Sequence, residues 1–446
     1  MTTISTKEEE LQEQDLARIE AKVEKATKGF LRTFAALKHR NYRLFFTGQM
    51  ISQIGTWMQT TGQAWLVLTL THSAWALGVI GALQFLPVMI FSLFGGVLAD
   101  KLPKRTVLVF TQTAAMLQAA LLWTLVITGT VQLWHLFIFA TLLGLTNSLD
   151  MPTRQAFVAE MVGREDLPNA VALNSSLVNM ARVVGPGIGG LLIAWLGNAP
   201  LFLLNAISFI PVILGLLLID ARKLHTHNLS NHPKYGRKVS TFQSLAEGFR
   251  YIGKTPIILL VILVLGSISL FGINFNILIP IFATDVLRGG PESYGFLSAA
   301  YGIGSLIGAL LLASRSTRSP VAQWLLLGMG FSTLEIMFAF SHWYWLSLIL
   351  IAFVGLTQVS FTATANTTLQ TVSPDHLRGR IMSVYMLVFA GSTPLGNLLM
   401  GGLANTIGAS LGLAVGAVLC LISAFIGWAL RAPAEKNIEQ VLYAKR

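Results

Sequence analysis

The sequence is poor in cysteine and in charge. Cys420 is the only cysteine among 446 residues, so the chain has neither a disulfide framework nor a cysteine-rich metal site. Charged residues make up 11% of the chain, whereas a soluble domain averages about 25%. The phosphate-binding pattern GxxxxGK[ST] does not occur. These deficits exclude a disulfide-stabilised secreted domain and argue against a soluble protein and against ATP as the energy source.

Apolar residues are abundant instead and are gathered into long runs. They make up 54% of the chain. Twelve apolar segments are each long enough to cross a hydrocarbon core of about 30 Å as a helix. No segment alternates every second residue, as the strands of an outer-membrane barrel do. The net charge of +11 is spread over short clusters, which does not favour nucleic-acid binding. We therefore expect an all-α membrane protein with twelve transmembrane helices.

Lysine and arginine are distributed unevenly about these segments. With the N-terminus inside, all of them except Arg182 and Arg288 fall in cytoplasmic tails, in cytoplasmic loops or at the helix ends that face these loops. Such an excess marks the cytoplasmic side of a membrane protein. We predict that both termini are cytoplasmic and that the basic stretch before residue 44 forms an amphipathic helix on the membrane surface.

One long polar connection divides the chain. Its histidines lie among polar residues, and we interpret the segment as an irregular, solvated linker rather than a metal site. The expected organisation is a cytoplasmic tail with the amphipathic helix at 1–43, a six-helix bundle at 44–220, the linker at 221–255, a second six-helix bundle at 256–431 and a cytoplasmic tail at 432–446.

The two predicted bundles repeat each other in sequence. "GLTN" at Gly144 recurs as "GLTQ" at Gly355, an offset of 355 − 144 = 211 residues. "SAWALG" before the second apolar segment parallels "PESYG" before the eighth. We infer a duplication that produces two pseudo-symmetric bundles, a plan that places binding sites near the midplane between them. The same offset relates two further glycine pairs: Gly185 with Gly396, and Gly190 with Gly401.

Two motifs resemble those of the major facilitator superfamily of secondary transporters. "GGVLADKLPKR" resembles the superfamily's cytoplasmic signature loop, although Pro103 stands where glycine is usual and the second half has Ser314 where the aspartate would be. "GPGIGG" resembles the antiporter motif of exporters. With "RNYRLFFTGQ" and "MPTRQAFVAEMV", these motifs resemble the bacterial subgroup that includes enterobactin exporters. The matching residues are Gly96, Asp100, Lys101, Lys104 and Arg105 in the loop, and Gly185, Pro186, Gly189 and Gly190 in the antiporter-like motif.

The resemblance implies a location in the bacterial inner membrane and a function for each motif. The loop would act as a latch that opens during alternating access, although anchoring by the positive-inside rule is the simpler interpretation. The antiporter-like glycines would thin and kink their helix for close packing, either for export or for structure alone. Helices one, four, seven and ten would line the central cavity.

Polar side chains on those four helices are the candidates for lining the cavity. On helix one they recur every three or four residues and so share a face, and a polar face in a membrane should face protein or water. Interhelical hydrogen bonding is the alternative for any single amide. The candidates are Gln49, Gln53, Trp57, Asn147, Asn274, Gln358 and Asn366.

Two acidic residues are candidates for proton coupling. A buried carboxylate can exchange a proton because desolvation disfavours its charged form. Asp150 lies four residues before Arg154, a spacing that also allows a structural salt bridge. Glu335 lies on a predicted scaffold helix, where a structural hydrogen bond is the alternative. Both remain candidates at this point.

Arg182 lies about thirteen residues into the fifth helix, about 20 Å from its start. Its planar guanidinium suits the oxygens of a carboxylate, catecholate or phosphate. We expect it to line the cavity and to attract an anionic substrate, or else to bond helix-end carbonyls or the amides of helix one.

These features predict a transporter rather than an enzyme, without cofactor or metal, driven by an ion gradient, presumed to be of protons. The expected function is export of a small amphipathic or anionic organic compound, such as a siderophore or a drug. The expected partners are this substrate and the lipid bilayer, with no nucleic acid and a monomeric state. An importer or uniporter of the same fold and a lipid-moving protein are the alternatives.

Overall fold

The computed structural model describes residues 34–225, 241–314 and 321–444, and these ranges contain helices and short turns without strands. The predicted N-terminal amphipathic helix and the linker residues 226–240, with two of the linker histidines, lie outside the described residues. The same holds for the side chains of 92–101, in the signature loop, and of Ser314.

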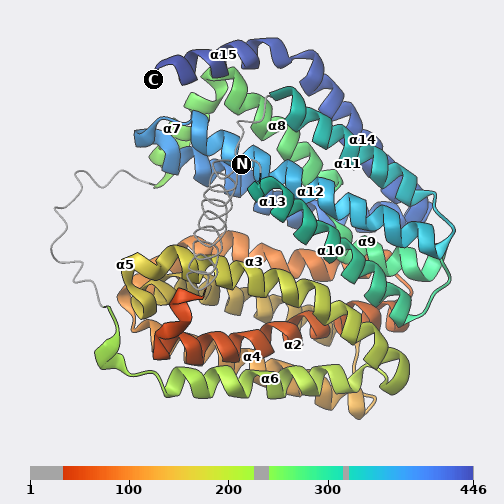
Figure 1. Ribbon diagram of the computed structural model, residues 1–446. Helices are drawn as coiled ribbons and strands as arrows, with labels where there is room; N and C mark the ends of the chain where they lie inside the picture. Colours follow the sequence, from red (N-terminus) through yellow and green to blue (C-terminus); the bar gives the residue numbers. More distant parts are fainter. Residues whose placement is uncertain (1–33, 226–240, 315–320, 445–446) are drawn as a thin grey trace, which may run out of the picture.

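The helices form two groups, which Figure 1 displays one above the other. The lower, N-terminal helix group contains η1 (Ala35–Lys38), α2 (Arg40–Thr71), α3 (Ala74–Lys101), α4 (Lys104–Ile127), α5 (Leu133–Leu196), α6 (Ala199–Leu217) and η2 (Ala221–Lys223). The upper, C-terminal helix group contains α7 (Thr241–Lys254), α8 (Pro256–Phe271), α9 (Phe275–Ile281), η4 (Phe282–Val286), α10 (Pro291–Ser314), α11 (Val321–Ala339), α12 (Tyr344–Val372), α13 (Asp375–Ile407), α14 (Ala409–Ala429) and α15 (Arg431–Ala444).

Ten of the described helical segments are long and apolar enough to cross a membrane. One of them, α5, has 64 residues and a length of about 96 Å at 1.5 Å per residue, far more than one crossing needs. Gly163 interrupts it with a φ of +74°, a left-handed conformation that suits glycine. α2 has 32 residues but is not among the ten, because its amides and hydroxyls lower its apolar character.

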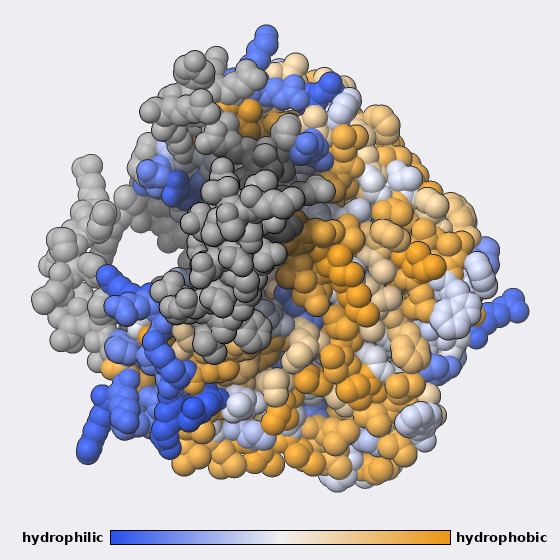
Figure 2. Space-filling model, in the orientation of Figure 1, coloured by the Kyte–Doolittle hydropathy of each residue, from blue (hydrophilic) through white to orange (hydrophobic). Residues whose placement is uncertain are grey.

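The surface is apolar and several polar groups are inside, the reverse of a soluble protein. Large apolar side chains such as Phe110 and Trp195 are 66% and 75% exposed, whereas Gln49 and Glu335 are buried. Figure 2 shows an apolar band between hydrophilic side chains at the left and right margins of the visible face. This distribution is that of a protein surrounded by lipid, in which polar groups must find partners inside.

Two segments that we expected to form a linker and a tail outside the bundles are helical. The second part of the predicted linker forms α7, which packs against α8 and α13. The predicted C-terminal tail begins as α15, which packs against α8 through side chains that include Ala434 and Ile438. Both helices have an apolar side that packs on the bundle, so the expectation of an irregular, solvated linker was wrong for α7.

The glycines that the sequence repeats make equivalent contacts in the two groups. A Cβ atom on Gly144 of α5 would lie 2.4 Å from the carbonyl oxygen of Gln84 in α3. A Cβ atom on Gly355 of α12 would lie 2.2 Å from the carbonyl oxygen of Tyr301 in α10. Real Cβ atoms do not approach this closely, so both positions need glycine for the backbones to meet.

The repeated pair Gly190 and Gly401 instead joins the groups to each other. A Cβ atom on Gly190 of α5 would lie 2.5 Å from the carbonyl oxygen of Pro291 and 2.9 Å from Cα of Gly295, both in α10. A Cβ atom on Gly401 of α13 would lie 2.9 Å from Cα of Gly78 in α3. The two groups therefore meet backbone to backbone near the first turns of α3 and α10.

The opposite end of the molecule is held together differently. There, Lys38 bonds Asp166 at 2.8 Å and Lys104 bonds Glu160 at 2.7 Å, both within the N-terminal helix group. Arg380 pairs with Glu247 inside the C-terminal helix group. None of the ion pairs among the described residues joins one group to the other. The structure therefore has the two groups in contact at one end and separately braced at the other.

We expect Gly190→Leu to separate the groups at the end where they meet. Overpacking costs about 1–3 kcal/mol, enough to shift the population about tenfold. Ser73 donates to Asn405 across the groups at 3.1 Å, so Ser73→Cys with Asn405→Cys gives a disulfide reporter. Its yield should fall severalfold with Gly190→Leu. Gly330→Leu is the matched control, since no atom lies within 4 Å of a Cβ atom there; equal yields in both variants would contradict this account.

Candidate functional site

One part of the polar face of α2 packs against α6, and another part lies at the junction of the two helix groups. Gln53 and Trp57 are half-buried, whereas Gln59, which we did not predict, is buried and accepts a hydrogen bond from Asn205 of α6 at 2.7 Å. Gly55 lets the two helices approach at this point. This turn of the polar face therefore joins α2 to α6.

Asp150 lies at the centre of a polar network that connects α2, α4 and α5. Its Oδ1 accepts hydrogen bonds from Thr111 at 2.7 Å and from Gln112 at 2.8 Å. Its Oδ2 pairs with Arg154, the partner that the sequence spacing allowed. Arg154 also donates to Gln49 at 2.7 Å. The carboxylate is 2% exposed, and both of its oxygens have partners. Proton coupling by Asp150 stays a prediction.

Arg182 lies on α5 where the two helix groups meet. Its guanidinium carbon lies 5.2 Å from the ring centroid of Trp57 in α2, a cation–π distance. Across the junction, Gly302 of α10 packs against the backbone of Val183 and Arg182. The buried Nε of Arg182 has no hydrogen-bond partner in the described part of the chain. Arg182 therefore has donor capacity to spare beside an aromatic ring.

Tyr301 of α10 directly precedes Gly302, the residue that packs against Val183 and Arg182 across the junction. Its hydroxyl donates to Gln358 of α12 at 3.2 Å. Its ring lies 4.9 Å from that of Phe275 in α9. Sequence reasoning missed Tyr301, because a tyrosine in an apolar run carries no signal until its neighbours are known. It connects Gln358, a predicted cavity residue, to the junction.

The remaining predicted cavity residues are spread along the helices. Asn274 lies at the break between α8 and α9, donates to the carbonyl of Leu270 at 2.8 Å and is almost fully buried against Gly396. Asn366 accepts a hydrogen bond from Gln370 on the same helix, and Asn147 is half-buried on α5. The structure therefore brings Trp57, Arg182 and Gln358 toward the junction but does not unite all the candidates in one cluster.

Glu335 is buried in the C-terminal helix group without a partner. It lies on α11 and is 0% exposed, and neither carboxyl oxygen has a hydrogen-bond partner among the residues described. The structural hydrogen bond that we considered for it is therefore absent there. Burying a carboxyl group without a hydrogen-bond partner in an apolar interior is costly. Glu335 and Asp150 thus have opposite surroundings.

The signature loop is described only at its C-terminal end. Lys104 bonds Glu160 at 2.7 Å, and Arg105 donates to the carbonyl of Leu217 at 2.5 Å. These contacts connect the start of α4 to α5 and to the end of α6. The side chains of Gly96, Asp100 and Lys101 lie outside the described residues, so the latch stays a prediction.

The antiporter-like motif has two packing faces. A Cβ atom on Gly185 would lie 2.5 Å from Cβ of Trp57, and Gly189 also packs against α2. Gly190 and the carbonyl of Pro186 instead contact α10 in the other group. One short motif therefore fixes α5 against its own group and against the opposite group. Its proximity to Trp57 also positions the ring on which Arg182 stacks.

No group of three or more histidine, cysteine, aspartate or glutamate side chains with the geometry of a metal site occurs among the residues that the structure describes. The polar groups at the junction are amide, hydroxyl and guanidinium groups, which bind ligands by hydrogen bonds and charge.

A family profile described as transmembrane secretion effector matches residues 31–445. The chain belongs to this family of the major facilitator superfamily. It is accordingly a multi-pass membrane transporter and not an enzyme.

The relatives match this chain over most of its length. The chain is 27% identical over 379 residues to the staphyloferrin A transporter of Staphylococcus aureus, covering 82% of this chain and 90% of that protein. It is 30% identical over 356 residues to the multidrug efflux pump Tap of Mycolicibacterium fortuitum, covering 77% and 84%. It is 26% identical over 366 residues to the enterobactin exporter EntS of Shigella boydii, covering 82% and 85%.

Solved structures share the fold at low sequence identity. The nucleoside transporter NupG has a TM-score of 0.68 at 14% identity, covering 89% of this chain and 99% of NupG. A bacterial homologue of the lysosomal transporter Spinster, in an inward-facing and unoccupied conformation, has a TM-score of 0.66 at 14% identity, covering 90% of this chain and 98% of that one.

We expect Asp150→Asn to destabilise the protein, because it leaves the Arg154 charge without its counterion. Breaking a buried ion pair costs about 3–5 kcal/mol, although Arg154 is 17% exposed and solvent reduces this figure. The melting temperature in detergent should therefore fall by several degrees. The double variant Asp150→Asn/Arg154→Gln removes both charges and should recover part of the loss; an equal or greater loss would show that the pair does not act as a unit.

Proposed function

We propose that this transporter exports a small amphipathic or anionic organic compound, such as a siderophore or a drug, in exchange for protons. The relatives support export, since two of them are named as an exporter and an efflux pump. They also support the substrate class, since they act on siderophores or drugs. The proposal places the protein in the bacterial inner membrane, with twelve crossings and both termini in the cytoplasm.

Arg182 carries the substrate part of this proposal. It lies at the junction of the two helix groups, on the same helix as the glycines that bring the groups together. Its unpartnered Nε and planar fork suit carboxylate, catecholate or phosphate oxygens. Trp57 offers an aromatic face beside it, which suits an amphipathic or aromatic compound. Because the site contacts both helix groups, its shape changes when the two groups move relative to each other.

The lengths of the described helices support the proposal of twelve crossings. The long helix α5 counts as one of the ten apolar segments. Its break at Gly163 divides it into two parts, each long enough to cross the membrane, so it supplies two crossings. α2 supplies the remaining one, since a polar face is tolerated in a membrane helix that packs against protein. The positive-inside distribution then orients both ends of the chain to the cytoplasm.

Glu335 is the better-placed of the two proton candidates. Its buried carboxyl group has no partner among the described residues, so a proton that it binds or releases is not held in a hydrogen-bond network. Asp150 is held by three donors instead.

We expect Arg182→Gln and Arg182→Lys to weaken the binding of an anionic substrate by about 10- to 100-fold. A hydrogen bond to a charged group contributes about 1.5–3 kcal/mol, and Lys lacks the planar fork. The measurement is equilibrium binding of anionic and cationic ligands to the purified protein. Arg222→Gln is the matched control, since Arg222 is exposed far from the junction. Equal losses for both ligand charges, with a lower melting temperature, would make Arg182 part of the scaffold.

We expect Glu335→Gln to abolish pH-gradient-driven substrate accumulation in proteoliposomes while substrate exchange continues. Glutamine has the size and neutral charge of the protonated acid but cannot release a proton. The variant should also keep the wild-type melting temperature, because no described hydrogen bond is lost. Retained gradient-driven accumulation would reject Glu335 and leave Asp150, tested in the Asp150→Asn/Arg154→Gln background, as the candidate.

A further inference from the structure

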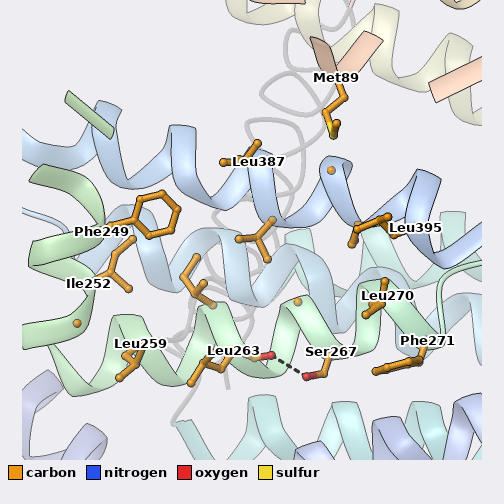
Figure 3. Close-up of a pocket in the computed structure, with 16 residues that line it drawn as sticks. Met89, Phe249, Ile252, Leu259, Leu263, Ser267, Leu270, Phe271, Leu387 and Leu395 are labelled. Carbon is orange, nitrogen blue, oxygen red and sulfur yellow. Dashed lines mark hydrogen bonds between the residues drawn. The ribbon is translucent and has the colours of Figure 1, made fainter. Parts of the chain in front are cut away.

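An elongated groove lies beside the junction and has not been assigned a role. It has a volume of about 640 Å³ and is formed by α7, α8 and α13, with Met89 of α3 reaching over it from the other helix group. Figure 3 shows Leu259, Leu263 and Leu270 of α8 along one wall, Leu387 and Leu395 of α13 along the other, and Phe249 at one end.

The groove offers almost nothing to a polar ligand. Its lining is leucine, isoleucine, phenylalanine, valine, methionine and glycine, with two serines. Ser267 donates its hydroxyl to the carbonyl of Leu263 at 3.0 Å, the contact drawn in Figure 3. Ser392 donates to Ser269 at 2.8 Å. Both hydroxyl hydrogens are therefore already used, and the part of an occupant that lies inside the groove is held by apolar contact.

The groove opens sideways from the protein. Leu263, Leu387 and Leu395 are 60%, 44% and 59% exposed, and they lie on segments that are apolar enough to cross a membrane. The environment outside the opening is therefore lipid hydrocarbon. An alkyl chain can enter from the bilayer without passing through water.

One end of the groove has positive charge beside it. Phe249, Ile252 and Gly253 of α7 line this end, and the same helix carries the exposed side chains of Arg250 and Lys254. The nearby acid of α7, Glu247, is already paired with Arg380. A basic amphipathic helix at the end of an apolar channel suits an anionic headgroup attached to an alkyl chain.

The groove also spans the two helix groups. A Cβ atom on Gly391 of α13 would lie 3.3 Å from the sulfur of Met89 in α3. An occupant would therefore contact both groups at once. Methionine suits this position, because its flexible thioether adapts to an irregular partner.

We propose that this groove binds an acyl chain of an anionic bilayer lipid, with the headgroup against Arg250 and Lys254 of α7. The lipid chain fills apolar space between α8 and α13, and its contact with Met89 makes its binding depend on the relative position of the two groups. This site is separate from Arg182 and does not depend on which compound is transported.

The test uses the full chain in nanodiscs that contain phosphatidylglycerol with a photoactivatable diazirine in the acyl chain. After illumination, peptide mass spectrometry should place the label on α8 and on the 387–395 segment of α13. Leu387→Trp fills the groove and should reduce this labelling at least fivefold. Ile422→Trp is the matched control, because it fills a smaller groove of about 230 Å³ between α8 and α14 and should leave the labelling unchanged.

The headgroup is tested with charge variants. Arg250→Gln/Lys254→Gln should lower labelling by the phosphatidylglycerol probe to the level of a phosphatidylcholine probe. The control pair Arg222→Gln/Lys223→Gln, exposed in the N-terminal helix group, should not. Equal labelling of both grooves, or equal labelling by both probes in the wild type, would overturn the proposal. So would displacement of the label by a transported drug but not by unlabelled phosphatidylglycerol, which would make the occupant the substrate.

Discussion

Close backbone contact between helices is the constraint on which this structure depends. Lipid is as apolar as leucine, so burying apolar side chains does not drive membrane helices together; packing and interhelical hydrogen bonds do. At Gly190 with Gly295, and at Gly401 with Gly78, the absence of side chains allows the two helix groups to meet. Both contacts lie at one end; at the other end, the ion pairs among the described residues, such as Lys104 with Glu160, lie within one group.

The polar interior divides into groups that are satisfied and groups that are not. Both carboxylate oxygens of Asp150 have partners, and Arg154 also donates to Gln49, so this network joins α2, α4 and α5. Glu335 and the Nε of Arg182 have no partner among the described residues, and the same is true of the Nε of Arg154 and the Nε2 of Gln49. A buried polar group without a partner destabilises a protein, so under the proposed function a ligand at Arg182 or a proton at Glu335 would reduce this cost.

The two helix groups are related by sequence duplication but differ in chemistry. The N-terminal group has the paired acid, the signature loop and the stacked Arg182. The C-terminal group has an unpaired acid, a helix broken between α8 and α9 at Asn274, and the apolar groove beside α7. Tyr301 lies where they meet, since it bonds Gln358 within its own group and precedes Gly302, which packs against Arg182 and Val183. The proposed substrate and lipid sites both adjoin contacts between the groups, so a change in the relative position of the groups would alter both sites.

The sequence by itself determined the class of protein, the family and the glycine contacts. Helix length, apolar composition and repeated glycines are local properties, and each is read from consecutive or regularly spaced residues. The sequence spacing allowed the pair of Asp150 with Arg154, but the tertiary structure decided the other partners of the two acids. Asp150 gains two donors from α4, whereas Glu335 has none among the described residues. The helical state of α7 and the importance of Tyr301 were equally hidden, because both depend on the helices that pack against them, and a hydrogen bond or a buried face exists only once these neighbours are in place.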